Sequence, residues 1–173
     1  MKDTPEFVLE IFLQPGELHF GEGDTRIRTL LGSCVAMVLW HPRRKLGGMC
    51  HYLLPTRQEH KLAGALDGRY ADEALWLFMH ELERTRTHPA DYQVKLFGGG
   101  HMLGKGEGDD ASVPRRNVVA ARELMRKHGF RVTAQDLGGR GHRNVIFDLW
   151  NGDVWVRRNL LGKAALSAEA SAA

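Results

Sequence analysis

Hydrophobic residues along most of this chain alternate with polar ones or form short runs bounded by glycine and proline. Alternation with a period of two is typical of β-strands that bury one face. The run at residues 35–40 is apolar throughout, so it fits either a buried strand or a buried helix. Elsewhere the pattern predicts strands at residues 7–13, 18–20, 25–31, 49–54, 92–97, 130–137, 144–150 and 153–157.

Two segments instead repeat their apolar residues at three- and four-residue steps, as amphipathic helices do. The first helix is expected at residues 67–88 with Asp67 as its N-cap, and the second at residues 117–128 with Gly129 ending it. Asn151-Gly152 predicts a tight hairpin between the last two strands. These elements together predict an α+β protein in which strands predominate.

The composition narrows the class of protein without identifying it. A chain of 173 residues with 43% hydrophobic residues can form one domain with a sizeable core, expected at residues 1–162. Residues 163–173 are nearly all Ala, Ser and Glu, so we expect a disordered tail there. The formal net charge of +3 is too small to imply a nucleic-acid or membrane partner.

The expected environment of the chain is the cytoplasm. The sequence has no apolar run of the ~20 residues that span a bilayer, and it begins without the pattern of a signal peptide. Two cysteines are too few for a disulfide scaffold, so we expect reduced thiols.

Cys34 and His51 are the strongest candidates for chemistry. Cys34 follows a Gly-Ser pair, and His51 lies 17 positions later. A neighbouring imidazolium stabilises a thiolate and so makes a cysteine nucleophilic. Gly32 allows close approach of the backbone, and a helix beginning after Ser33 would add free N–H groups for an oxyanion. The alternative is that Cys34 packs in the core, as free cysteines often do, and that His51 is structural.

A metal centre is a weaker candidate. Cys50 is adjacent to His51 and would point to the opposite face of a strand, which favours a core position. The sequence lacks C-x-x-C and H-E-x-x-H, the spacings that zinc sites normally use, so we expect neither metal nor cofactor. The conceivable ligands are Cys34, Cys50, His51, His41, His101 and His142.

Residues 99–105, Gly-Gly-His-Met-Leu-Gly-Lys, match most of a phosphate-binding P-loop. The match fails at Gly106, where the motif needs a Ser or Thr, and an acidic stretch follows in place of a helix. A mobile surface loop is therefore expected at residues 98–110. The pairs Arg115-Arg116 and Arg157-Arg158 lack interleaved aromatic residues and fit solvated faces better than a nucleic-acid site.

The most informative blocks of sequence flank the two candidate residues. They read Thr29-Leu-Leu-Gly-Ser-Cys34-Val-Ala and Gly47-Gly-Met-Cys-His51-Tyr-Leu-Leu-Pro55. Together with later blocks in the same order, they resemble the CheD family of chemoreceptor glutamine deamidases over residues 8–158. The later blocks are Lys95-Leu-Phe-Gly-Gly-Gly100, Arg116-Asn117, Asp136-Leu-Gly-Gly139, Arg143-Asn-Val-Ile-Phe147 and Gly152-Asp-Val-Trp-Val156.

The resemblance implies a cysteine-dependent hydrolase that converts specific chemoreceptor glutamines to glutamates and releases ammonia. Some family members are also credited with hydrolysing receptor methyl esters. Cys34 would be the nucleophile and would form a thioester, while backbone N–H groups near Ser33 and Cys34 stabilise the oxyanion. His51 would protonate the leaving ammonia and then activate water.

The resemblance assigns the orientation of His51 to a threonine just upstream of the nucleophile. Thr29 lies five positions before Cys34, whereas the family pattern places the threonine six positions before, where this chain has Arg28. A shift of one residue in a strand reverses the direction of the side chain. Thr29 is therefore the assignment, and Ser33 or a backbone carbonyl is the alternative.

The resemblance also implies a fold and partners. The fold is a layered sandwich of two packed mixed β-sheets flanked by helices, related to the catalytic domains of deamidating toxins. The substrate would be the cytoplasmic domain of a chemoreceptor, and a CheC-type phosphatase is a further partner. An adaptor that binds this phosphatase is the rival function, and a cysteine hydrolase of small amides is a third.

Overall fold

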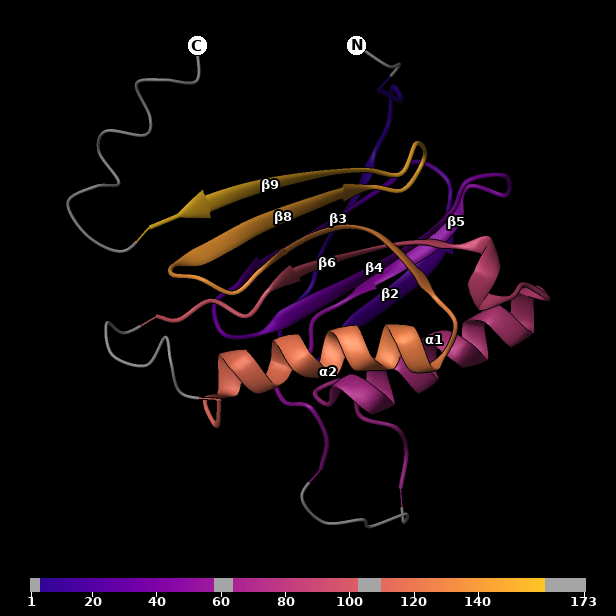
Figure 1. The fold of residues 1–173 in the computed structure, drawn as a ribbon. Coiled ribbons are helices and arrows are strands. Elements are labelled where there is room, and N and C mark those ends of the chain that lie inside the picture. Colours follow the sequence, from indigo (N-terminus) through magenta and orange to yellow (C-terminus); the bar gives the residue numbers. More distant parts are fainter. Residues whose placement is uncertain (1–3, 58–63, 103–109, 161–173) are drawn as a thin grey trace.

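The computed structural model describes residues 4–57, 64–102 and 110–160, and it arranges them in three layers (Figure 1). Two helices pack on one face of a five-stranded sheet, and a four-stranded sheet packs on its other face. Both sheets are mixed, because each contains one parallel pair of strands. The predicted α+β sandwich of two sheets is therefore confirmed, with both helices on the same side.

The five-stranded sheet lies in the middle of the molecule and has the order β2-β5-β4-β6-β7. Its central strand is buried on both faces, which explains the uninterrupted apolar run at residues 35–40 and settles it as a strand. The strands are β2 (Leu18–Glu22), β4 (Val35–His41), β5 (Leu46–Cys50), β6 (Gln93–Gly98) and β7 (Arg131–Leu137).

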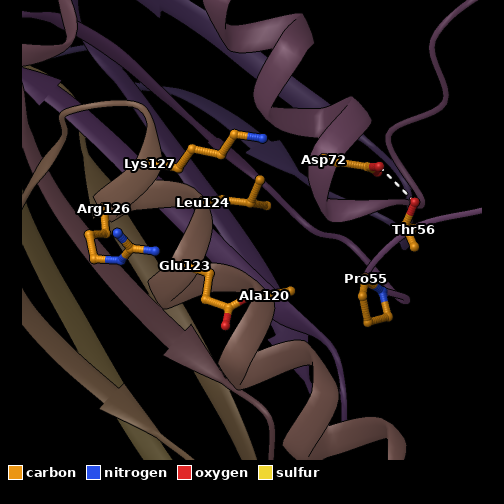
Figure 2. Close-up of a pocket in the computed structure, with 8 residues that line it drawn as sticks. All are labelled: Pro55, Thr56, Asp72, Ala120, Glu123, Leu124, Arg126 and Lys127. Atoms are coloured by element: carbon orange, nitrogen blue, oxygen red, sulfur yellow. Dashed lines mark hydrogen bonds between the residues drawn. The ribbon is translucent and has the colours of Figure 1, made fainter.

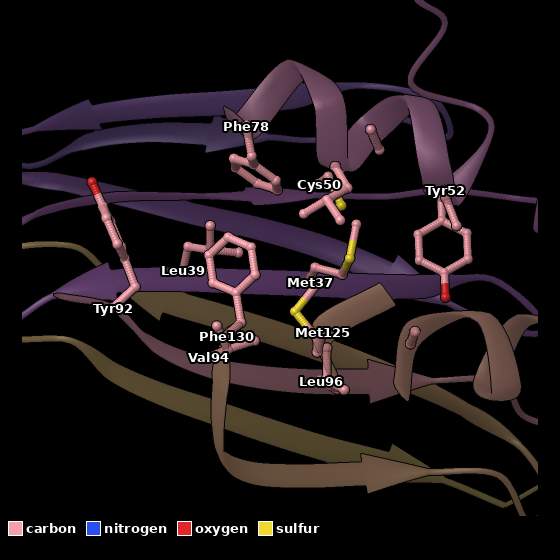
Figure 3. Close-up of a cluster of buried hydrophobic side chains, with 14 of the residues drawn as sticks. Met37, Leu39, Cys50, Tyr52, Phe78, Tyr92, Val94, Leu96, Met125 and Phe130 are labelled. Atoms are coloured by element: carbon pink, nitrogen blue, oxygen red, sulfur yellow. The ribbon is translucent and has the colours of Figure 1, made fainter. Parts of the chain in front are cut away.

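Successive residues of β4 serve two separate cores. Val35, Met37 and Leu39 face the helices, where they pack with side chains of α1 (Ala71–Thr85) and α2 (Val113–Lys127). Figure 3 shows this core, with Phe78 of α1 and Met125 of α2 directed toward the sheet. The residues between them on β4 face the four-stranded sheet and form the second core with it.

The four-stranded sheet has the order β1-β3-β8-β9. Its strands are β1 (Leu9–Phe12), β3 (Thr25–Leu31), β8 (His142–Asp148) and β9 (Asp153–Asn159). In β3 and β8, buried residues alternate with less buried ones, because one face meets the five-stranded sheet and the other faces outward. The predicted last hairpin is confirmed as the antiparallel pair β8–β9. Its connection is four residues long, because β8 ends at Asp148.

Both helices are confirmed, but their predicted starts are wrong. Asp67 does not cap α1; its carboxylate accepts the backbone N–H of Arg69 instead, and the helix begins at Ala71. The second helix begins at Val113, four residues before the predicted start, because Pro114 in the first turn needs no hydrogen-bond acceptor. Gly129 follows its end with a φ of 76°, as the pattern indicated.

The fifth strand is also displaced from its prediction, at residues 46–50 in place of 49–54. Gly47 and Gly48 lie within it and do not precede it, because a Cβ at either position would contact the backbone of a neighbouring strand. A short 3₁₀ helix, Pro89–Asp91, precedes β6. Within the described residues, no helix is long and apolar enough to cross a membrane. The expected tail at residues 163–173 lies outside the described residues.

Candidate active site

The pairing of β4 with the segment after β5 places Cys34 and His51 on the same face of the five-stranded sheet. Val35 and Tyr52 exchange two backbone hydrogen bonds, with N···O distances of 3.1 and 3.0 Å. The same register places His51 opposite Ala36, and Cys34 lies two residues from Ala36 along the strand. Side chains two residues apart share a face, so both candidates face the four-stranded sheet. Cys34 packs against the core between the sheets.

Cys50 points the other way, into the core beneath the helices (Figure 3). It is fully buried, and burial raises the pKa of its thiol to about 12. This confirms the interpretation of Cys50 as a core residue. Of the two cysteines, only Cys34 is partly exposed.

Thr29 of β3 reaches across from the opposite sheet to His51. Its Oγ1 lies 2.9 Å from the carbonyl oxygen of Leu13 and 2.7 Å from Nδ1 of His51. The carbonyl can only accept a hydrogen bond, so the hydroxyl donates its one proton to Leu13. Nδ1 of His51 must then carry a proton and donate to Thr29. This fixes the tautomer with a free lone pair on Nε2.

The structure places Thr29, and not Arg28, in contact with His51. Arg28 projects from the outer face of the four-stranded sheet, where its guanidinium lies 3.3 Å from Glu10. Thr29 is buried and directed between the sheets, although it lies one position nearer to Cys34 than the family pattern places its threonine. The hydroxyl that contacts His51 belongs to Thr29, and within the described residues neither Ser33 nor a backbone carbonyl hydrogen-bonds to the ring.

Burial makes both Cys34 and His51 electrically neutral in the resting site. Desolvation lowers the pKa of the His51 imidazole to about 4. It also raises the pKa of the Cys34 thiol, an effect that hydrogen bonds from the Ser33 hydroxyl and the backbone N–H of Cys34 oppose. Nε2 of His51 is buried and has no hydrogen-bond partner in the described part of the chain. The site therefore combines a thiol with a neutral, unengaged proton acceptor.

Three consecutive glycines at the end of β6, residues 98–100, form a glycine block that supports the segment carrying Cys34. The backbone N–H of Gly99 donates to the Cys34 carbonyl at 2.8 Å, and that of Gly100 donates to Gly32 at 2.9 Å. Gly98 has a φ of 115°, and a Cβ there would contact the Cys34 carbonyl. Residues 98–100 thus serve close packing of two backbones. Of the expected loop at residues 98–110, residues 103–109, which include the end of the P-loop match, lie outside the described residues.

The helix considered after Ser33 does not form, because β4 begins at Val35. A strand offers no cluster of free N–H groups at its start, so a helix N-terminus does not stabilise an oxyanion here. The Ser33 hydroxyl and the backbone N–H of Cys34 are the hydrogen-bond donors that lower the pKa of the thiol.

Two buried polar residues beside this segment stand in the blocks that carry the resemblance, but the sequence assigned them no role. Asn117 is fully buried at the start of α2, and its side-chain nitrogen donates to the Ser33 and Leu53 carbonyls. Arg143 is also fully buried and donates to Asp136 at 3.0 Å and to Gly138 at 2.6 Å. A signal for Asn117 exists in the sequence, because its spacing places it on the apolar face of a helix with Ala121 and Leu124.

The other candidates do not form a second centre. Within the described ranges, no group of three or more His, Cys, Asp or Glu side chains could hold a metal ion. Arg115 pairs with Asp110, and Arg158 donates to the Arg140 carbonyl. A cavity of about 290 Å³ lies between α2 and the start of α1 (Figure 2), and neither Cys34 nor His51 lines it.

Comparison with known proteins shows the family of this chain. Residues 53–158 match the family described as CheD chemotactic sensory transduction. A probable chemoreceptor glutamine deamidase CheD of Pseudomonas savastanoi pv. phaseolicola is 52% identical over 158 residues, covering 90% of this chain and 88% of the relative. A probable chemoreceptor glutamine deamidase CheD 3 of Dechloromonas aromatica is 47% identical over 156 residues, covering 90% and 91%.

A more distant relative, probable chemoreceptor glutamine deamidase CheD 1 of Leptospira interrogans, is 37% identical over 161 residues, covering 89% of this chain and 95% of the relative. The family match begins at residue 53 and so excludes Cys34 and His51. Alignments that cover 90% of the chain must include both residues. The chain belongs to the CheD family.

Proposed function

We propose that this chain is a protein-glutamine deamidase that acts on chemoreceptors in the cytoplasm, with Cys34 as its nucleophile. The observation that carries the proposal is the hydrogen bond of 2.7 Å between Thr29 and Nδ1 of His51. It leaves Nε2 as a free proton acceptor on the face that also carries Cys34. The names of the relatives supply the substrate class, since they are described as probable chemoreceptor glutamine deamidases.

The first half of the reaction forms a thioester. As the Cys34 sulfur adds to the carboxamide carbon of glutamine, its proton passes to Nε2 of His51. The backbone N–H of Cys34 stabilises the negative charge on the carboxamide oxygen. When the C–N bond breaks, His51 returns the proton to the departing nitrogen, and ammonia leaves.

The second half consumes water and restores the site. Nε2 of His51 takes a proton from a water molecule as its oxygen attacks the thioester carbon. The C–S bond breaks, the proton returns to the Cys34 sulfur, and glutamate is released. Throughout both halves the Thr29 hydroxyl accepts from Nδ1 and so supports the protonated ring. The neutral resting state agrees with this scheme, because His51 begins each half without a proton on Nε2.

The test is ammonia release from a purified chemoreceptor cytoplasmic fragment, with the modified glutamines mapped by mass spectrometry. Wild type should convert Gln to Glu, and Cys34→Ala and His51→Ala should lose at least ~10²-fold in rate. Cys50→Ala is the matched control, because it removes a thiol that points away from the site, and it should retain turnover.

Turnover by Cys34→Ala at the wild-type rate would disprove the thioester mechanism. Absence of conversion by folded wild type would instead favour the adaptor function. In that case a CheC-type phosphatase should bind wild type and Cys34→Ala equally well, since docking needs a surface and not a thiol. Turnover of free glutamine or simple esters would indicate a hydrolase of small substrates.

A further inference from the structure

Asn117 contacts the segments on both sides of the Cys34–His51 pair. Its Nδ2 donates to the Ser33 carbonyl at 3.0 Å and to the Leu53 carbonyl at 2.7 Å. Ser33 immediately precedes Cys34, and Leu53 lies two residues after His51. One side-chain amide thus joins the two backbone segments that carry the candidate nucleophile and base.

The orientation and identity of this side chain follow from its surroundings. Both neighbouring groups are carbonyl oxygens, so only the NH₂ end of the amide can face them. Its Oδ1 is buried without a partner in the described residues, which leaves an unfavourable desolvation cost. The backbone carbonyl of Asn117 also accepts a hydrogen bond of 2.6 Å from the Tyr52 hydroxyl. A serine would provide one donor in place of two, and a longer glutamine would not fit the same separation.

We propose that Asn117 is a positioning residue that holds Cys34 in line with His51 for amide hydrolysis. The predicted effect on amide hydrolysis rests on the proposed function, whereas the restraint on the Cys34 segment does not depend on that function. The backbone N–H groups of Gly99 and Gly100 already hold the Cys34 and Gly32 carbonyls. Asn117 adds the restraint on the Ser33 carbonyl, which lies between those two in the sequence, so its loss frees that carbonyl while the others stay held.

Two effects of removing the Asn117 side chain distinguish a positioning residue from one that only stabilises the fold. Asn117→Ala should lower kcat by about 10- to 100-fold and change KM by less than about threefold, because misalignment of about 1 Å affects the chemical step. The freed segment should also expose the Cys34 thiol to solvent and remove the burial that raises its pKa. Alkylation of Cys34 at neutral pH should therefore become at least about threefold faster while turnover becomes slower.

The experiment measures receptor-fragment deamidation and, separately, the rate of iodoacetamide alkylation at each cysteine by mass spectrometry. Asn117→Asp keeps the size of the side chain but directs a carboxylate at two carbonyl oxygens, so it should behave like Asn117→Ala. Asn144→Ala, on the outward-facing side of β8, is the matched control and should resemble wild type in both assays. Cys50 reports on global opening, because it is fully buried in the other core.

Faster alkylation at Cys34 alone, with reduced kcat, supports the positioning role. Equal acceleration at Cys34 and Cys50 would overturn it, since that result indicates general loosening of the fold. Unchanged alkylation and kcat in a folded Asn117→Ala protein would also overturn it. If wild type itself does not deamidate the receptor fragment, the proposed function fails, and the alkylation rates still decide whether Asn117 restrains Cys34.

Discussion

Replacing Thr29 with valine tests the hydrogen-bond chain behind His51. Valine has nearly the same shape as threonine but lacks the hydroxyl, so Thr29→Val removes two hydrogen bonds with little change in packing. The Leu13 carbonyl and the Nδ1–H of His51, at 2.9 and 2.7 Å from that hydroxyl, both lose their partner. Each buried group left unsatisfied costs about 1–3 kcal/mol, so the unfolding free energy should fall by about 2–6 kcal/mol.

The effect on catalysis follows from the tautomer of His51. With no acceptor at Nδ1, the proton is no longer held there, and the tautomer that carries it on Nε2 gains population. That tautomer cannot accept a proton from Cys34. A buried hydrogen bond of about 1.4 kcal/mol shifts such a ratio about tenfold, and loss of ring orientation adds to it. We expect kcat to fall about 10- to 100-fold.

Three measurements check this reasoning. Ammonia release gives kcat, urea titration gives the unfolding free energy, and ¹⁵N NMR of the imidazole gives the tautomer directly. Thr29→Ser is the control: it keeps both hydrogen bonds and loses one methyl group, so kcat should remain within about threefold at a cost of about 1 kcal/mol. A folded Thr29→Val protein with wild-type kcat would refute the role of the hydroxyl, and one with Nδ1 still protonated would refute the tautomer argument.

Three further predictions concern pH, the glycine block and the second cysteine. Burial lowers the pKa of His51 from its ordinary 6.5 to about 4 in the folded chain. Between pH 4 and pH 6.5 the unfolded state therefore binds more protons than the folded state. Unfolding free energy should fall by about 3 kcal/mol as pH drops from 6.5 to 4, and His51→Gln should lack this loss in acid titrations. Gly98→Ala, at a φ of 115° and against the Cys34 carbonyl, should lose about 2–3 kcal/mol and most turnover. Gly23→Ala, at a φ of 86° in open space, should lose about 1 kcal/mol and keep its activity, and equal effects would contradict the contact with Cys34. Cys50→Ala should cost about 1–2 kcal/mol in urea unfolding without lowering kcat more than twofold, and lost turnover in folded protein would contradict its core assignment.

The elements that sequence reasoning predicted best are those in which one face alone is buried. In residues 25–31, the alternation of apolar and polar side chains gave the bounds of β3 without error. In residues 35–40 both faces are buried, so no alternation exists and the pattern could not choose between strand and helix. Asp67 failed as a predicted cap because Arg69 competes for its carboxylate, a contact that no propensity anticipates.

The candidate site was partly accessible from sequence for a similar reason. The opposite directions of Cys50 and His51 follow from the period of a strand and needed no tertiary structure. The contact between Thr29 and His51 joins two different sheets, so it depends on how the sheets face each other. Asn117 could be placed on a helix face, but its two carbonyl partners become visible only in the fold.

Burial of the Cys34 thiol also bears on how long the protein survives between substrates. Peroxides and stray electrophiles attack the thiolate, and sulfinic or sulfonic acid formed at a nucleophile is not reversed by ordinary thiol reductants. A thiol whose pKa is raised by its surroundings spends almost all its time protonated at neutral pH. In the proposed mechanism the resting chain is thereby protected from oxidative damage, because reactivity develops only while a carboxamide occupies the site and His51 accepts the proton.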